Sequence, residues 1–172
     1  MDFLYAFLRI THVLAAFVWF GLAFSQVFFV MPAAQRMGDA GRRYLRGFYQ
    51  HTRFALVMNV SSLLVTAAGL LMYALAMGPI GGFTNLGNMS LAMGATAGIL
   101  AFGHGVAALG RLTGQYETSA ALATANGASP DAEQEQELVY LENKLKRNGW
   151  ISFGLMTVAL VTMSVARYLP EM

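Results

Sequence analysis

Four long apolar stretches, separated by polar segments, dominate the chain. They cover about residues 3–31, 54–77, 89–109 and 150–166, and the first contains a single charged side chain, Arg9. A hydrocarbon core of about 30 Å is crossed by about 20 helical residues, and a single segment in lipid satisfies its backbone groups only as a helix. The pattern therefore predicts an all-α fold, an integral membrane four-helix bundle that forms one transmembrane domain over all 172 residues.

The longest polar segment, residues 112–148, is predicted to form a cytoplasmic loop with a short helix. Ser129 is a favourable N-cap and Pro130 a favourable first residue. Acidic residues occupy the first turn of the predicted helix and basic residues its last turn, which is the arrangement that the helix dipole favours. The small and polar residues 120–129 are typical of a flexible link. We expect the helix to continue into the fourth apolar stretch.

Positive charge distinguishes the connections between the apolar stretches. The first and third connections are basic, whereas residues 78–88 are uncharged and rich in Gly, Pro and Asn. By the positive-inside rule the basic connections lie in the cytoplasm, and both termini and residues 78–88 lie on the outer, periplasmic side. Residues 33–50 also carry aromatic side chains, which is typical of a segment that lies partly on the inner leaflet. The basic residues of the two connections are Arg36, Arg42, Arg43, Arg46, Arg53, Arg111, Lys144, Lys146 and Arg147.

Composition agrees with a membrane protein and narrows its chemistry. Hydrophobic residues make up 56% of the chain and charged residues 12%, against roughly 25% charged residues in soluble domains. Because the chain has no cysteine, disulfides, iron–sulfur clusters, thiolate zinc sites and cysteine nucleophiles are excluded. The basic clusters border apolar stretches, which favours a topology signal over a nucleic-acid site. The sequence also lacks the common phosphate-binding, zinc-protease, serine-hydrolase and dinucleotide motifs.

Two histidines lie within the apolar stretches, His12 in the first and His104 in the third. Each shares a helical face with small or polar residues, so each is expected to point into the bundle. An ionisable group at such a position is costly and indicates a functional site. Without cysteine, imidazole is the natural ligand of haem iron, and Met is its usual partner in electron-transfer haems. The alternative for each histidine is an interhelical hydrogen bond, and His51 is expected to be an ordinary boundary residue.

The depths of these histidines leave the ligand pair open. At a rise of 1.5 Å per residue the two histidines differ in depth by roughly 8 Å. Two ligands of one iron must lie close together, so a single iron held by both histidines would be strained. A pair of His12 with a Met, or two single-ligand sites, fits at least as well, and Met93 and Met163 lie near the depth of His12. Arg9, one turn outward, is expected either to pair with a haem propionate or to extend to the interface. Trp19 is expected either to stack on a flat ring or to pack in the core.

The first and third stretches resemble those of a known membrane family. The run HVLAAFVWFG, which starts at His12, is similar to the first-span motif of HemJ-type protoporphyrinogen oxidases and their CopD-like (copper-resistance D) relatives. The run HGVAALGR, which starts at His104, is similar to their third-span histidine, small residues and base. Asn148 and Pro170 also stand where that family has Asn and Pro. The resemblance thus touches nearly the full chain.

This resemblance implies a four-helix membrane protein that binds haem b. For the HemJ branch it also implies oxidation of protoporphyrinogen to protoporphyrin. The chain departs from the HemJ pattern after FFVMP, where Pro-Arg-Leu is missing, and at residues 148–151, where Asn-Gly-Trp-Ile replaces Asn-Glu-Val-Pro. Because the acid of that motif is absent, the architecture and the haem are the expectations carried forward, and an oxidase activity stays open.

The leading hypothesis is a small b-haem membrane protein with a redox or electron-transfer role. The alternatives are a non-catalytic accessory subunit of a larger respiratory or photosynthetic membrane complex, and copper handling through Met and His. We expect a location in the bacterial inner (cytoplasmic) membrane. The expected partners are the lipid bilayer and either a larger membrane redox complex or further copies of the chain, and no nucleic acid. The residues expected at the site are His12 and His104 as iron ligands, with Arg9, Trp19, Met93 and Met163 around the cofactor.

Overall fold

A computed structural model describes residues 2–77, 85–123 and 130–169, and within these residues every regular element is helical. This confirms the predicted all-α fold class for the described part of the chain. The elements are α1 (Asp2–Ser25), η1 (Gln26–Val30), α2 (Met31–Arg36), α3 (Asp39–His51), α4 (Phe54–Met77), α5 (Leu86–His104), η2 (Gly105–Gly110), α6 (Arg111–Ala123), α7 (Ala132–Val165) and η4 (Ala166–Tyr168).

Several of these elements join into long rods. The segments α1, η1 and α2 follow one another without a break, as do α5, η2 and α6, with η1 and η2 as short π-helical stretches inside them. Among the described residues, four helical units are long and apolar enough to cross a membrane, and each coincides with or contains most of one predicted stretch: Phe3–Arg36, Phe54–Leu75, Leu86–Ala123 and Ala132–Tyr168.

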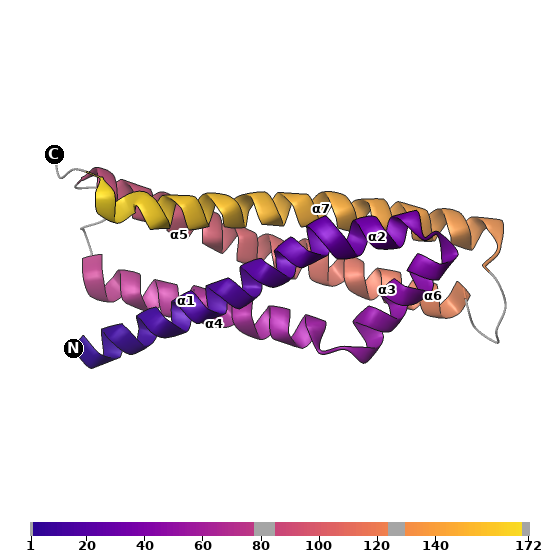
Figure 1. Cartoon of the computed structure of the whole chain (residues 1–172), viewed down its shortest axis with the longest axis horizontal. Coiled ribbons are helices and arrows are strands. Elements are labelled where there is room, and N and C mark those ends of the chain that lie inside the picture. The colour runs from indigo at the N-terminus through magenta and orange to yellow at the C-terminus, as the bar shows by residue number, and fades with distance from the viewer. Residues whose placement is uncertain (1, 78–84, 124–129, 170–172) are drawn as a thin grey trace.

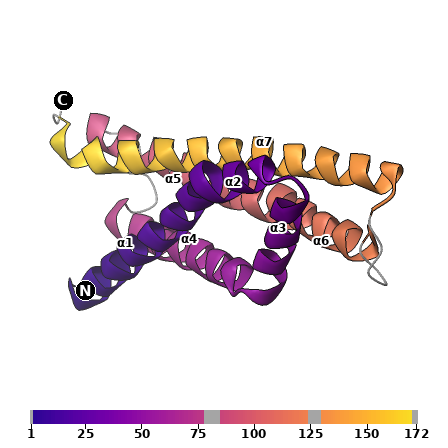
Figure 2. The ribbon, with the colours of Figure 1, turned by 45° about the vertical axis from the view of Figure 1, so that its right-hand side comes forward.

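The four units run alternately up and down the bundle. The start of α1, the end of α4, the start of α5 and the end of α7 lie at one end, and α2, α3, α6 and the start of α7 lie at the other (Figure 1). The packing is closest within two antiparallel pairs, α1 with α4 and α5 with α7, and fewer contacts join one pair to the other. A view turned by 45° shows α3 standing between α2 and the start of α4 at the second end (Figure 2).

The helix predicted near residue 130 begins at Ala132 and is one continuous α7 of 34 residues that runs through the fourth apolar stretch. Its N-cap is Asp131, whose carboxylate accepts hydrogen bonds from the backbone N–H groups of Glu133 and Gln134. The Gln134 side chain accepts one in return from the Asp131 N–H, which completes a capping box. The expected cap, Ser129, lies outside the described residues, as do 78–84 of the outer loop, 124–129 of the expected link, and Pro170.

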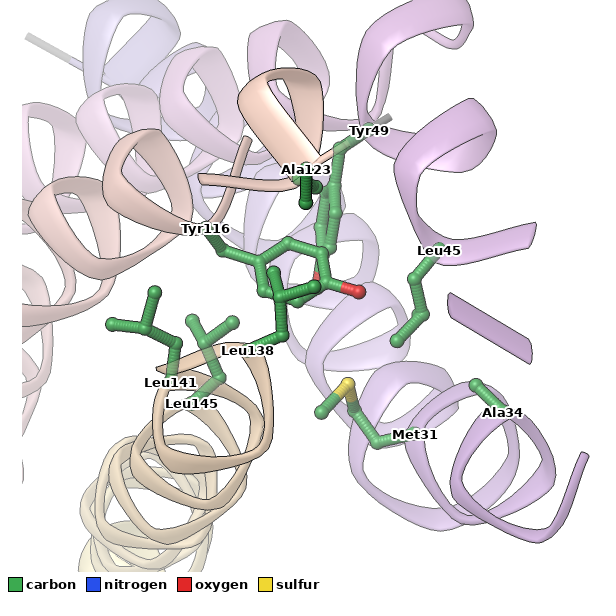
Figure 3. Packing of buried hydrophobic residues seen from close by; sticks show 10 residues of the cluster. Met31, Ala34, Leu45, Tyr49, Tyr116, Ala123, Leu138, Leu141 and Leu145 are labelled. Atoms are coloured by element: carbon green, nitrogen blue, oxygen red, sulfur yellow. The ribbon is translucent and has the colours of Figure 1, made fainter. Parts of the chain in front are cut away.

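The polar end of the molecule has a protein core of its own. Side chains of α2, α3, α6 and the first half of α7 meet there (Figure 3), and Tyr116 and Leu45 are 0% and 1% exposed. The apolar positions of α3 recur every four residues, so one side of an otherwise basic helix is covered by protein. The core residues are Met31, Ala34, Leu45, Tyr49, Tyr116, Ala120, Ala123, Leu138, Leu141 and Leu145.

Arg42 of α3 holds this end together through charge. Its guanidinium forms ion pairs with Glu135 and, at 3.4 Å, with Glu142 on α7, and a third at 3.2 Å with Asp39 on its own helix. Glu142 is only 7% exposed and also accepts a hydrogen bond of 3.3 Å from the Tyr116 hydroxyl. Burial alone would lower the pKa of the Arg42 guanidinium, but the hydrogen bond to Glu135 and the charges of the three carboxylates raise that pKa above its ordinary value.

Candidate functional site

His12 lies between α1 and α4, with its ring against the α4 backbone. Its Nδ1 atom is 2.8 Å from the carbonyl oxygen of Val65. Because a carbonyl only accepts, Nδ1 carries the proton, and in the neutral ring Nε2 keeps a free lone pair. Gly69 makes room for the ring, since a Cβ at that position would lie 3.0 Å from His12 Cε1. The ring is thus held through one nitrogen, as it is in many metal-ligating histidines.

His104 lies between the helices of the other pair, at the end of α5, and both of its ring nitrogens have partners on α7. Nδ1 is 2.8 Å from Ser152 Oγ, and Nε2 is 3.0 Å from Asn148 Oδ1. The Asn148 amide is oriented by its Nδ2, which donates a bond of 2.8 Å to the Lys144 carbonyl oxygen. Its Oδ1 therefore accepts, so Nε2 of His104 carries the proton and Nδ1 accepts from the Ser152 hydroxyl. The two histidines thus differ in tautomer and in surroundings.

Replacing His104 by leucine is expected to weaken the packing of α5 on α7. The change leaves the buried Ser152 hydroxyl and the half-buried Asn148 oxygen without their imidazole partner, which costs about 2 kcal/mol. Thermal unfolding of the purified protein in detergent, followed by circular dichroism, measures the loss. Ser119→Ala removes the exposed bond of 3.0 Å between Ser119 and Glu137 and serves as the control. Equal effects of the two changes would contradict a structural role for His104.

The six residues expected at one site lie in different places. Arg9 is exposed on α1, and Met93 is 55% exposed on α5. Met163 is partly buried beside Gly94, where an added Cβ would come within 2.6 Å of its Cγ. Trp19 is 9% exposed and packs in a core cluster that also contains Val65, the partner of His12. Among the described residues, no three His, Asp or Glu side chains gather as a metal site would require.

A cavity of about 310 Å³ lies between the two helix pairs and extends toward the polar end. Its wall includes residues of both π-helical stretches, Gln26 and Val27 of η1 and Gly105 and Val106 of η2. Short π-helical stretches within α-helices are rare and frequently occur at functional sites. The sequence gives no signal for either stretch, because QVFFV and GVAALG do not interrupt the apolar stretches that contain them. Trp19 is the member of the expected set that lines this cavity.

Three polar side chains on this wall extend the site beyond the expected residues. Gln26 Nε2 donates a hydrogen bond to the Tyr49 hydroxyl, while Gln26 Oε1 is buried without a hydrogen-bond partner in the described structure. Burial raises the pKa of the Tyr49 phenol, so Tyr49 keeps its proton over the ordinary pH range. Asn59 of α4 also lines the cavity. Amides within apolar stretches are visible in the sequence, but their meeting with Tyr49 is a result of helix packing.

Comparison of the chain with protein-family models, with characterised proteins and with solved structures finds no match.

Proposed function

We propose that the four apolar helical units cross the bacterial inner membrane and that the end formed by α2, α3, α6 and the start of α7 lies in the cytoplasm. Both basic segments of the chain belong to this end of the bundle, which supports the orientation by the positive-inside rule. Large apolar side chains point outward from every unit, as contact with lipid requires. Examples are Phe17 (78% exposed), Leu63 (58%), Leu100 (55%) and Val161 (53%).

Within this membrane domain, the protein acts as a b-haem protein with a redox or electron-transfer role, in which His12 would hold the haem iron. The observation that supports this is the bond from His12 Nδ1 to the Val65 carbonyl, with Gly69 making room for the imidazole ring. That bond fixes the tautomer and the orientation of the ring and leaves Nε2 as a free donor for iron. A bound haem would supply one-electron chemistry at its iron.

His104 fits the haem less well than His12. To bind iron, its ring would have to give up the bond to Ser152 or the bond to Asn148. In this proposal His104 therefore serves as a positioning residue that couples α5 to α7. This differs from a site in which both histidines hold one iron, and a methionine would then be the other residue of the chain able to bind it.

The first experiment is a dithionite-reduced minus oxidised absorption spectrum of the protein purified alone in mild detergent from cells with adequate haem. A sharp α-band of haem b near one haem per chain is expected. A featureless spectrum from folded protein would instead favour the accessory-subunit hypothesis, and the next step would be to identify the complex with which it co-purifies.

His12→Ala is expected to lower the haem content at least about tenfold. Even the loss of a residue that only hydrogen-bonds to a metal ligand lowers metal affinity about 10–100-fold, and loss of the ligand itself should cost at least as much. His51→Ala is the matched control, since His51 is an exposed residue at the end of α3. Both variants should insert and purify like the original chain. An unchanged band in His12→Ala would remove His12 as the ligand, and a lost band in His51→Ala would contradict the assignment of His51 as an ordinary boundary residue.

A further inference from the structure

The cavity between the helix pairs has the composition of a small-molecule site. Its volume of about 310 Å³ is at the lower end of the range of about 300–1,000 Å³ that such sites cover. Five aromatic side chains from α1, α3, α4, α5 and α7 contribute to its wall, and none of them is a histidine. They are Trp19, Tyr49, Phe54, Phe102 and Trp150.

The same wall carries polar groups that the protein does not use fully. Asn59 lies about 8 Å into α4 at 1.5 Å per residue, is exposed on the α4 side of the cavity wall, and forms no side-chain hydrogen bond with another described residue. The Tyr49 hydroxyl accepts from Gln26 but donates to no described group. A polar side chain within an apolar helix costs free energy unless it is paired, so unpaired groups on a cavity wall indicate a ligand.

The cavity also joins the apolar and the polar parts of the molecule. Met156 and Ser62 line it on the side of the apolar stretches, and Glu117 and Lys146 line it at the polar end. A molecule that fills such a space needs an apolar body and a polar head. Of the possible bodies, a flat ring suits a wall rich in aromatic side chains best, because offset and edge-to-face ring contacts add to apolar burial.

We propose that this cavity binds a membrane-dissolved amphiphile that consists of an alkyl chain and a hydroxylated aromatic ring, with the hydroxyl group bonded to Asn59 and Tyr49. An amide oxygen accepts the proton of a phenolic hydroxyl, and the Tyr49 hydroxyl donates to its oxygen. The two π-helical stretches provide part of the wall on opposite helix pairs. The site does not depend on a haem, because His12 lies outside the cavity wall.

The test uses two probes that differ only in the hydroxyl group, ortho-bromo-para-decylphenol and the corresponding decyl bromobenzene. Bromine quenches tryptophan fluorescence on contact, and the two tryptophans of the chain, Trp19 and Trp150, both line the cavity. The full chain in detergent is titrated with each probe. Since each probe partitions into micelles to the same extent for every variant, the change in the ratio of the two half-saturating concentrations between the original chain and a variant reports the contribution of the hydroxyl.

The original chain is expected to bind the phenol about tenfold more tightly than the bromobenzene, as one or two hydrogen bonds would provide. In Asn59→Leu and in Tyr49→Phe that ratio should fall to about threefold or less while bromobenzene binding persists, which also shows that the variants are folded. Tyr116→Phe, a change at a buried tyrosine outside the cavity, should keep the full ratio. Three results would overturn the proposal. They are titrations that do not saturate, an equal affinity of the original chain for both probes, and a ratio that stays unchanged in both Asn59→Leu and Tyr49→Phe.

Discussion

Gly41→Ala is expected to lower the free energy of unfolding by about 3 kcal/mol or more, at the upper end of the usual cost of overpacking. A Cβ at this position of α3 would lie 1.9 Å from the backbone oxygen of Ala34 in α2 and 2.6 Å from its carbonyl carbon. Backbone atoms cannot rotate away as a side chain does, so α2 and α3 would have to separate. The polar-end core around Leu45 would then open. Thermal unfolding in detergent measures the effect.

Gly47→Ala on the same helix is the matched control. No atom lies within 4 Å of a Cβ built at Gly47, and alanine favours a helix over glycine by about 1 kcal/mol. The two glycine changes are therefore expected to have opposite signs. A destabilisation of equal size at both positions would mean that α2 and α3 do not pack as closely as the structure has them.

The second large effect is expected for Arg42→Met, which removes the partner of a buried carboxylate. Glu142 is left between Tyr116 and the apolar core without its cation, and loss of one member of a buried pair costs about 3 kcal/mol. The loss also frees Glu135 on α7. We expect a lower unfolding temperature and faster proteolysis of the polar end.

Arg43→Met tests whether this effect belongs to the ion pairs rather than to the loss of a positive charge. Arg43 is exposed on the same helix, so its replacement is expected to change stability by about 0.5 kcal/mol or less. A double change, Arg42→Met with Glu142→Gln, should recover part of the loss because it no longer buries an unpaired charge. If Arg42→Met and Arg43→Met behave alike, Arg42 does not hold α3 to α7.

The polar end of the molecule was predicted from the sequence only in part. The sequence predicts that residues 33–50 lie partly on the inner leaflet and that residues 112–148 form a loop with a short helix. In the structure, α3 and the polar parts of α6 and α7 pack around Tyr116, and the segment predicted as a loop contains α6 as well as the start of α7. A signal for this was present in the spacing of Gly41, Leu45 and Tyr49, which lie on one face of a helix. The partners of that face on α6 and α7 are distant in sequence, so the spacing alone could not identify the core.

The candidate site shows a similar limit. Helical periodicity correctly predicts that His12, His104 and Trp19 turn toward neighbouring helices, because a helix repeats its faces every 3.6 residues. It does not say which neighbour each residue meets. His12 pairs with a residue 53 positions away, and His104 with residues 48 and 44 positions away. Such contacts depend on which helices form the close pairs. The hydrophobic pattern of one stretch does not identify the stretch against which it packs.

The length and hydrophobicity of the four stretches were enough to predict the helices. In lipid, the backbone N–H and C=O groups of a single apolar segment can form hydrogen bonds only within that segment. The distribution of basic residues likewise predicted that the first and third connections lie at the same end of the bundle. Only the tertiary structure decided that α1 pairs with α4 and α5 with α7, which tautomer each histidine takes, and that Gln26, Tyr49 and Asn59 share one cavity. These features arise from the fit of side chains between helices, where close approach at small residues such as Gly41 and Gly69 selects one arrangement among many of similar hydrophobicity.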